Sequence, residues 1–223
     1  MLFSFIIPTL NEEKAMLSNS SFLNNIRRYL NAELIVVDGG SQDSTVNLAR
    51  SLSCRLYITR ASRSSQLNLG AKHAKGKYLI FLHADTILNN EALYHIKNLS
   101  NDTLWGFLNI KLNSNKLKYK ILSSLINIRS RLFNYATGDQ VIIMKNTFFK
   151  NVIGFKGIDL MEDIELTNRL KKLCKPVLVN GLAITSIRRW RNHGFLKTIF
   201  LMRLLRILYF LGVSDKFLAK IYK

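Results

Sequence analysis

The sequence predicts an α/β fold with a doubly wound, mostly parallel central sheet. Short apolar runs recur along the first half of the chain, and each is typical of a strand buried on both faces. Polar, helix-compatible segments separate these runs, and such alternation predicts parallel strands joined by crossover helices. A chain of 223 residues is long enough for one substantial core, so a single α/β unit suffices.

The expected elements follow the chain in order. Strands are predicted over residues 3–7, 34–37, 56–59 and 78–82. After residue 100 the alternation weakens, and the remaining expected elements are strands over 104–112 and 140–144, with a long helix over 116–133 between them. No internal repeat or low-complexity segment interrupts this pattern.

Polar side chains follow three of these strands, over residues 8–13, 38–45 and 83–86. The carboxyl ends of parallel strands meet at one edge of a sheet, where ligands bind, so these clusters should form one crevice. Asp85 could hold a divalent cation beside a phosphate, because magnesium and manganese prefer oxygen ligands. The alternative is a helix cap, with Asp85 or Thr86 accepting backbone hydrogen bonds.

Composition leaves several classes of partner open. The formal net charge of +19 favours contact with nucleic acid, anionic lipid or a phosphorylated small molecule. Cys54 and Cys174 have no ligand-spaced partners, which predicts reduced thiols in a cytoplasmic protein. Residues 1–8 lack the basic region and cleavage site of a signal peptide, and no run of about eighteen apolar residues predicts a membrane span.

Four segments, residues 5–13, 36–45, 81–86 and 161–166, resemble in order and spacing the family 2 glycosyltransferases. These are inverting enzymes with the GT-A fold that use nucleotide-activated sugars. The resemblance extends from residue 3 to about residue 190 and is closest to short bacterial members. It implies a catalytic domain over 1–194, with a Rossmann-like nucleotide-sugar half (1–100) and an acceptor-side half (101–194), followed by a helical tail (195–223).

The resemblance implies a donor site at the strand ends. Thr9 and Glu12 match residues of the nucleoside pocket, and carboxylates such as Asp38 and Asp43 suit contacts to the base and ribose. Arg63 would pair with phosphate, although a solvated helix face is the alternative for its segment. The residues expected to bind the nucleotide sugar are Pro8, Thr9, Asn11, Glu12, Asp38, Gly39, Ser41, Asp43, Arg63, Gln66, Asn68, Ala84 and Asp85.

The same resemblance implies a metal and a base. Asp85 matches the last carboxylate of an Asp-x-Asp motif that holds Mn²⁺ or Mg²⁺, with His83 in the place of the first. His83 and His193 are further candidate ligands, while His83 could also bind a phosphate or pack in the core. Asp163 matches the catalytic base, although an acidic cluster in a first helical turn is also typical of a cap. The expected acceptor-side residues are Asp139, Glu162, Arg189 and Trp190.

The resemblance further implies a UDP-sugar donor and a single transfer, of the hexosyltransferase type, to a lipid or glycan acceptor. Residues 195–211 are apolar but carry three basic side chains, which fits an amphipathic helix at the cytoplasmic face of an anionic membrane. A helix packed on the domain or on a second copy in a homodimer is the alternative.

Two other functions fit the sequence less well. The net charge suits nucleic acid, but aromatic and basic residues do not alternate in a recognisable binding pattern, and the acidic clusters would repel a polyanion. A nucleotidyltransferase of similar fold is disfavoured because residues 8–12 replace the glycine-rich basic loop that such chemistry uses. We therefore expect no nucleic-acid partner.

Overall fold

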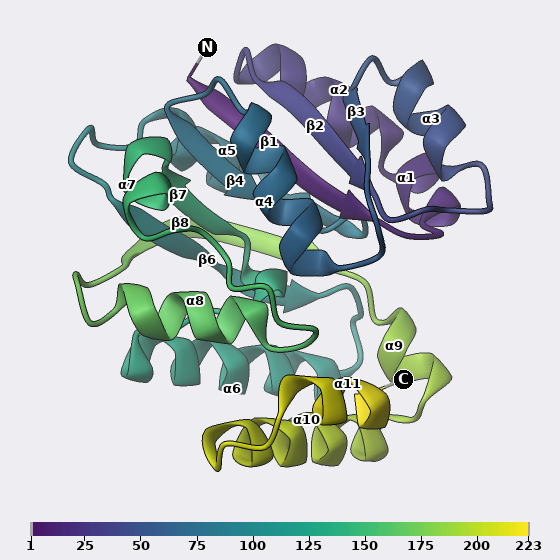
Figure 1. The fold of residues 1–223 in the computed structure, drawn as a ribbon, viewed down its shortest axis with the longest axis vertical. Helices are drawn as coiled ribbons and strands as arrows, with labels where there is room; N and C mark the ends of the chain where they lie inside the picture. Colours follow the sequence, from purple (N-terminus) through teal and green to yellow (C-terminus); the bar gives the residue numbers. More distant parts are fainter. Residues whose placement is uncertain (1, 223) are drawn as a thin grey trace.

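In the computed structural model, which describes residues 2–222, eight strands form one mixed sheet (Figure 1). Their order is β3-β2-β1-β4-β7-β6-β8-β5. The first four strands are mutually parallel, as are β6 and β8, whereas β7 and β5 run antiparallel to their neighbours. The strands are β1 (Phe3–Thr9), β2 (Glu33–Asp38), β3 (Arg55–Ile58), β4 (Tyr78–Phe81), β5 (Thr86–Leu88), β6 (Trp105–Leu112), β7 (Ile142–Lys145) and β8 (Val177–Thr185).

Helices cover both faces of this sheet, as the doubly wound prediction requires. Phe5 and Ile7 of β1 face one core, which α1, α2, α3 and α5 cover. Ile6, between them, faces a second core under α4, α7 and α8, because side chains alternate along a strand. The helices named so far are α1 (Glu13–Ser18), α2 (Ser20–Tyr29), α3 (Thr45–Ser51), α4 (Arg63–His73), α5 (Asn90–Lys97), α7 (Asn146–Asn151) and α8 (Glu162–Leu170).

The carboxyl-terminal part adds helices beyond the sheet. α6 (Leu117–Phe133) packs beneath β6, and α9 (Arg188–Asn192) follows β8. α10 (Phe195–Phe210) and α11 (Asp215–Tyr222) form a hairpin that packs against the start of α8 (Figure 1). None of the helices between residues 2 and 222 combines the length and apolar character that crossing a bilayer requires.

The structure corrects three details of the sequence prediction. Thr86 begins β5 rather than capping a helix, and the cap of the next helix is Asn89, which accepts from the Ala92 N–H at 3.0 Å. Gln140 lies in a 3₁₀ turn over Gly138–Gln140, so β7 starts at Ile142 rather than at residue 140. The predicted strands include neither the short β5 nor the nine-residue β8. Residues 1 and 223, the outer limits of the expected domain and tail, lie outside the described part.

Candidate active site

The ends of β1 and β2 are joined by a buried hydrogen-bond network. Thr9 Oγ1 donates to Asp38 Oδ2 at 2.9 Å, and the N–H groups of Gly40 and Ser41 donate to Asp38 Oδ1 at 2.9 and 2.7 Å. Burial by itself would raise the pKa of Asp38, but hydrogen bonds from Ser41, Thr9 and Gly40 lower it below its usual range. Asp38 is thus an ionised anchor for the loop after β2.

The loop after β1 docks on the loop after β2. The Asn11 N–H donates to Ser41 Oγ at 2.8 Å, and the Asn11 side chain accepts from the Gln42 N–H at 2.9 Å. Asp43 Oδ2 accepts from the Glu13 N–H at 3.1 Å, at the start of α1. The polar residues after these two strands therefore come together at one edge, and several of them bond to each other.

Helix α4 carries two amides that brace the same edge. Buried Gln66 donates through Nε2 to the Thr9 and Val37 carbonyls, both at 2.8 Å. Asn68 instead pairs with the backbone of Phe155, whose N–H and carbonyl lie 3.0 and 2.8 Å from its amide. Both side chains contact backbone, so they position the segments around the site.

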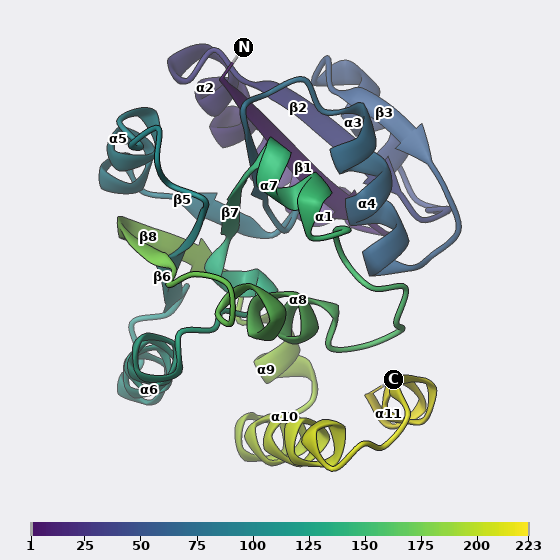
Figure 2. The same ribbon diagram turned by 60° about the vertical axis from the view of Figure 1, so that its left-hand side comes forward.

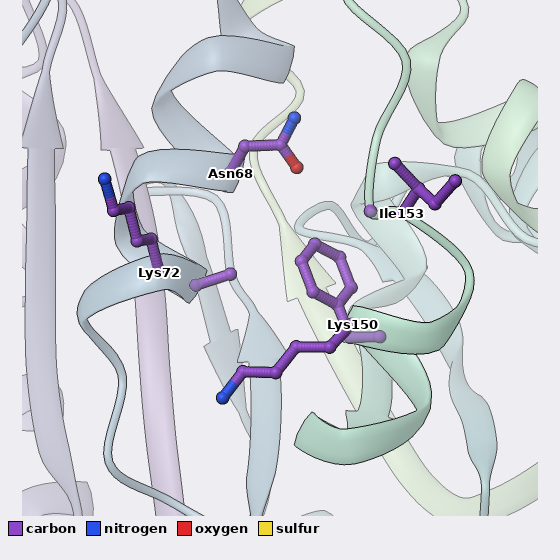
Figure 3. Close-up of a pocket in the computed structure, with 7 residues that line it drawn as sticks. Asn68, Lys72, Lys150 and Ile153 are labelled. Carbon is purple, nitrogen blue, oxygen red and sulfur yellow. The ribbon is translucent and has the colours of Figure 1, made fainter.

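Asn68 also borders a groove between α4 and α7, shown in Figure 3. The groove has a volume of about 290 Å³; Lys72 lines it from α4, and Lys150 and Ile153 line it from α7 and the segment after α7. It lies apart from the carboxylates at the strand ends.

His83 and Asp139 connect the end of β4 to the acceptor-side half. His83 Nδ1 lies 3.1 Å from Asp139 Oδ1. The other ring nitrogen faces Gly138, because a Cβ added to Gly138 would lie 2.6 Å from His83 Nε2. The Gly138 N–H in turn donates to Asp163 Oδ2 at 2.6 Å. This continuous path runs from β4 to the first turn of α8.

Asp163 and Glu162 differ in their surroundings. Asp163 is half-buried and accepts from the N–H groups of Gly138 and Ile164. Glu162 is buried, and Arg63 Nε lies 3.8 Å from its Oε1. Burial raises the pKa of Glu162, the neighbouring Asp163 raises it further, and Arg63 opposes the shift. Arg63 thus reaches from α4 to the α8 carboxylates.

The segment after β8 borders the site. Arg188 Nη2 bonds Glu12 Oε1 at 2.6 Å, which joins α9 to the β1 end. Arg189 stacks on the Tyr222 ring, with its guanidinium carbon 3.6 Å from the ring centroid. Trp190 packs instead in the apolar cluster between β6 and α6.

Tyr222, near the end of α11, had not been predicted as a neighbour of the site. Burial raises its pKa, Arg189 and Arg63 oppose the shift, and the charges of Asp139 and Asp163 add to it. Its position depends on a contact between segments far apart in sequence, for which the sequence carries no local signal. His193, the other distant candidate, is exposed at the end of α9.

The surroundings of Asp85 fit a divalent cation. Burial raises the pKa of Asp85, and the nearby charges of Asp139 and Glu12 raise it further, against the opposing effect of His83 and Arg188. Glu12 Oε2 is buried without a hydrogen-bond partner in the described part of the chain. A cation would relieve this excess of negative charge. Residues 2–222 hold no preformed group of three or more acidic, histidine or cysteine ligands, so oxygens of a substrate would have to complete the shell.

The fold is a mixed α/β sheet with polar side chains gathered at the ends of its parallel strands, and known proteins share it. Residues 4–103 match the family described as glycosyl transferase family 2. A 4,4'-diaponeurosporenoate glycosyltransferase from Staphylococcus haemolyticus is 34% identical over 96 residues, which cover 40% of this chain and 25% of the relative. A PGL/p-HBAD biosynthesis glycosyltransferase from Mycobacterium bovis is 38% identical over 96 residues, covering 39% and 36%. Over residues 4–103 the chain is therefore similar to glycosyl transferase family 2, and the relatives that it matches there are named glycosyltransferases.

Solved structures show the same fold. A mannosyltransferase from Pyrobaculum calidifontis in complex with GDP-Man and Mn²⁺ aligns with a TM-score of 0.65 at 17% identity, over 91% of this chain and 60% of that one. S. aureus TarS 1-349 in complex with UDP-GlcNAc aligns with a TM-score of 0.54 at 20% identity, over 82% and 56%. The GT-A fold is therefore confirmed. The matched stretch spans only a quarter to about a third of the two curated relatives described above.

Proposed function

We propose that this chain is an inverting glycosyltransferase that moves a sugar from a nucleotide diphosphate to an acceptor hydroxyl. The main support is the path from the β4 end through His83, Asp139 and Gly138 to Asp163, which links a donor-side strand to an acceptor-side helix. A displacement at an anomeric carbon needs a leaving diphosphate on one side and a base on the other. This path connects groups suited to both tasks.

The donor lies, in this proposal, across the carboxyl ends of β1, β2 and β4. Residues 1–100 hold the nucleotide sugar and residues 101–194 the acceptor, while 195–223 form the tail. We expect a UDP-sugar, and the neighbours in complex with UDP-GlcNAc or GDP-Man make both nucleotides worth testing. The loops with Asn11 (after β1) and Asp43 (after β2) border the nucleoside, and Arg63 faces the phosphates.

Asp85 would hold Mn²⁺ or Mg²⁺ together with donor oxygens. When bound, the cation stabilises the negative charge of the departing diphosphate. His83 has one ring nitrogen on Asp139 and the other facing Gly138, so in this arrangement it positions the turn that contacts Asp163. The neighbour in complex with Mn²⁺ supports a divalent metal.

Asp163 is the proposed base. It takes the proton of the acceptor hydroxyl while that oxygen forms a bond to the anomeric carbon and the bond to the diphosphate breaks. The backbone N–H groups of Gly138 and Ile164 donate to its two carboxylate oxygens and fix its orientation. Glu162, which burial and Asp163 make harder to ionise, suits an acceptor contact beside Arg63.

The acceptor is proposed to be a lipid or lipid-linked glycan, met at the cytoplasmic face of a membrane. The apolar contacts of α10 and α11 with Met161 and Ile164 place the tail beside the acceptor half. The inner face of the tail thus packs on the domain, which was the alternative interpretation to a helix at a membrane.

The test is a thermal-shift and calorimetric screen of UDP- and GDP-sugars with and without Mn²⁺, followed by release of nucleotide. Asp85→Ala should abolish the metal-dependent part of donor binding. Asp163→Asn should keep donor binding but lower turnover by about 10²- to 10⁴-fold, the usual contribution of a general base. Asp102→Asn, at an exposed turn, is the matched control. Full activity in both site variants contradicts the assigned roles.

A further inference from the structure

Helix α6 is apolar on two opposite faces. Its inner face packs beneath β6 through Tyr119, Leu122 and Ile126. Its outer face carries five large apolar side chains that are each at least 50% exposed: Leu117, Ile121, Leu125, Ile128 and Leu132. Steps of three and four residues align them in one stripe along the helix. We call this the α6 stripe.

Helix α10 repeats the pattern. Its inner face includes the fully buried Leu205, which packs in the cluster at the start of α8. Its outer face carries side chains that are 57 to 77% exposed: Leu196, Phe200, Ile207, Phe210 and Leu211. They again follow helical spacing and form the α10 stripe. Both α6 and α10 thus expose a second apolar face in addition to the one that packs on the domain.

The two helices lie in one region of the molecule. The Tyr119 and Phe195 rings, near the starts of α6 and α10, have centroids 5.3 Å apart. Further along, burial lowers the pKa of Arg129 in α6 to about 10, and Arg206 in α10 lowers it as well. Figures 1 and 2 both show α6 and α10 at the end of the molecule opposite the N-terminus. Both outer stripes face away from the cores that their inner faces cover.

The charge around the stripes is almost entirely positive. On α6, exposed basic residues lie on both sides of the stripe, with Lys118 on one side and Lys120 and Arg131 on the other, at 100° per residue. On α10, Arg203 lies within the stripe. Together α6, α10 and α11 contain nine Lys and Arg residues and one carboxylate, Asp215. A second copy of this chain would bring like charges together, whereas an anionic lipid surface complements them.

We propose that the α6 and α10 stripes dock together on an anionic lipid bilayer, with the apolar side chains in the acyl boundary and the basic side chains at the headgroups. The inner face of α10 contacts Met161 and Ile164, which flank the proposed base. The bilayer surface therefore lies about one helix diameter, roughly 10 Å, from the acceptor side of the site. This last step rests on the proposed function: the acceptor hydroxyl then belongs to a molecule held in that bilayer.

The test measures co-sedimentation with phosphatidylglycerol-containing vesicles and with pure phosphatidylcholine vesicles, without nucleotide. The parent should bind the anionic vesicles and release them as salt rises. Ile128→Glu and Phe200→Glu, at exposed positions of the two stripes, should each weaken binding by about tenfold or more, since each puts a charge into the acyl boundary. Tyr94→Glu, which changes a 57% exposed aromatic on α5, is the matched control and should bind as the parent does.

Equal binding by the parent and both stripe variants overturns the proposal, and so does a lack of binding to anionic vesicles. If the parent dimerises without lipid and either stripe variant abolishes that dimer, the proposal is overturned in favour of a second copy. Thermal melting of the variants verifies that they fold. The thermal shift caused by nucleotide sugar, measured in the same proteins, should be unchanged. A lack of that shift with intact vesicle binding counts against the proposed function and leaves the docking surface standing.

Discussion

Replacing Gln66 by leucine tests whether the donor edge is held by its own framework. The change keeps nearly the same size but removes the two donations from Nε2 to the Thr9 and Val37 carbonyls. The Thr9 carbonyl keeps one partner, since it also accepts from the Gly39 N–H at 2.8 Å. The perturbation is therefore the loss of two buried hydrogen bonds with little change in volume.

A typical intramolecular hydrogen bond contributes about 0.5 to 1.5 kcal/mol net, so Gln66→Leu should lower the free energy of unfolding by roughly 1 to 3 kcal/mol. For a chain of this size that corresponds to a fall in Tm of about 2 to 12 °C. Because Gln66 ties β1 to β2, the affinity for the nucleotide should fall along with stability.

Urea unfolding followed by circular dichroism measures the stability, and calorimetry with a UDP-sugar measures the affinity. Gln42→Leu makes the same substitution at an exposed position in the loop after β2. It should change the unfolding free energy by less than about 0.5 kcal/mol. If Gln66→Leu unfolds as the parent does while donor binding alone is lost, Gln66 contacts the donor directly and the framework reasoning is wrong.

Two further predictions concern the scaffold. Burial opposes the ionisation of Glu33, but its hydrogen bonds and its ion pair with Arg55 favour ionisation more strongly. The pKa of Glu33 therefore lies below its ordinary value of 4.5. Its carboxylate therefore stabilises the fold above pH 4.5. The difference in unfolding free energy between the parent and Glu33→Gln should shrink as the pH falls below that value. A difference that urea unfolding finds to be independent of pH contradicts this reasoning. Gly181 has φ +108°, and an added Cβ would lie 2.3 Å from the Ala92 N atom, so Gly181→Ala should cost about 2 kcal/mol or more, measured by denaturant unfolding. Gly157→Ala, which meets nothing within 4 Å, should be neutral, and equal effects of the two changes would refute the steric argument.

The strands that the sequence predicted are those with strong local signals. β1, β2 and β4 are short, apolar and bounded by polar residues, and the structure confirms them. β5 is only three residues long and exists because Thr86–Leu88 pairs with Ala183–Thr185 of β8, about a hundred residues away. Local pattern cannot reveal such pairing. The antiparallel insertion of β7 between β4 and β6 likewise depends on long-range contacts.

The candidate site shows the same division. The sequence predicted which polar segments meet at the sheet edge, because parallel strands align their carboxyl ends. It did not predict how each side chain is oriented. Trp190, expected on the acceptor side, packs in the apolar cluster between β6 and α6. Tyr222, in the last described turn of α11, stacks with Arg189. Both outcomes depend on the placement of α9 and α11, which rests on packing between distant segments. The assigned roles of the site residues stay predictions.

The orientation of the polar side chains also indicates which of them remain available to a substrate. Asp38 and Gln66 are buried and direct their polar atoms at backbone and neighbouring side chains. Along the path from β4 to α8, by contrast, burial and the charges of Asp139 and Glu12 raise the pKa of Asp85, and Asp139 keeps 52% of its side chain exposed. A bound ligand can compensate the negative charge around Asp85 that raises its pKa. A cationic or proton-donating part of a bound complex is therefore expected beside Asp85 and Asp139, whereas Asp38 and Gln66 act by keeping the strand ends in register.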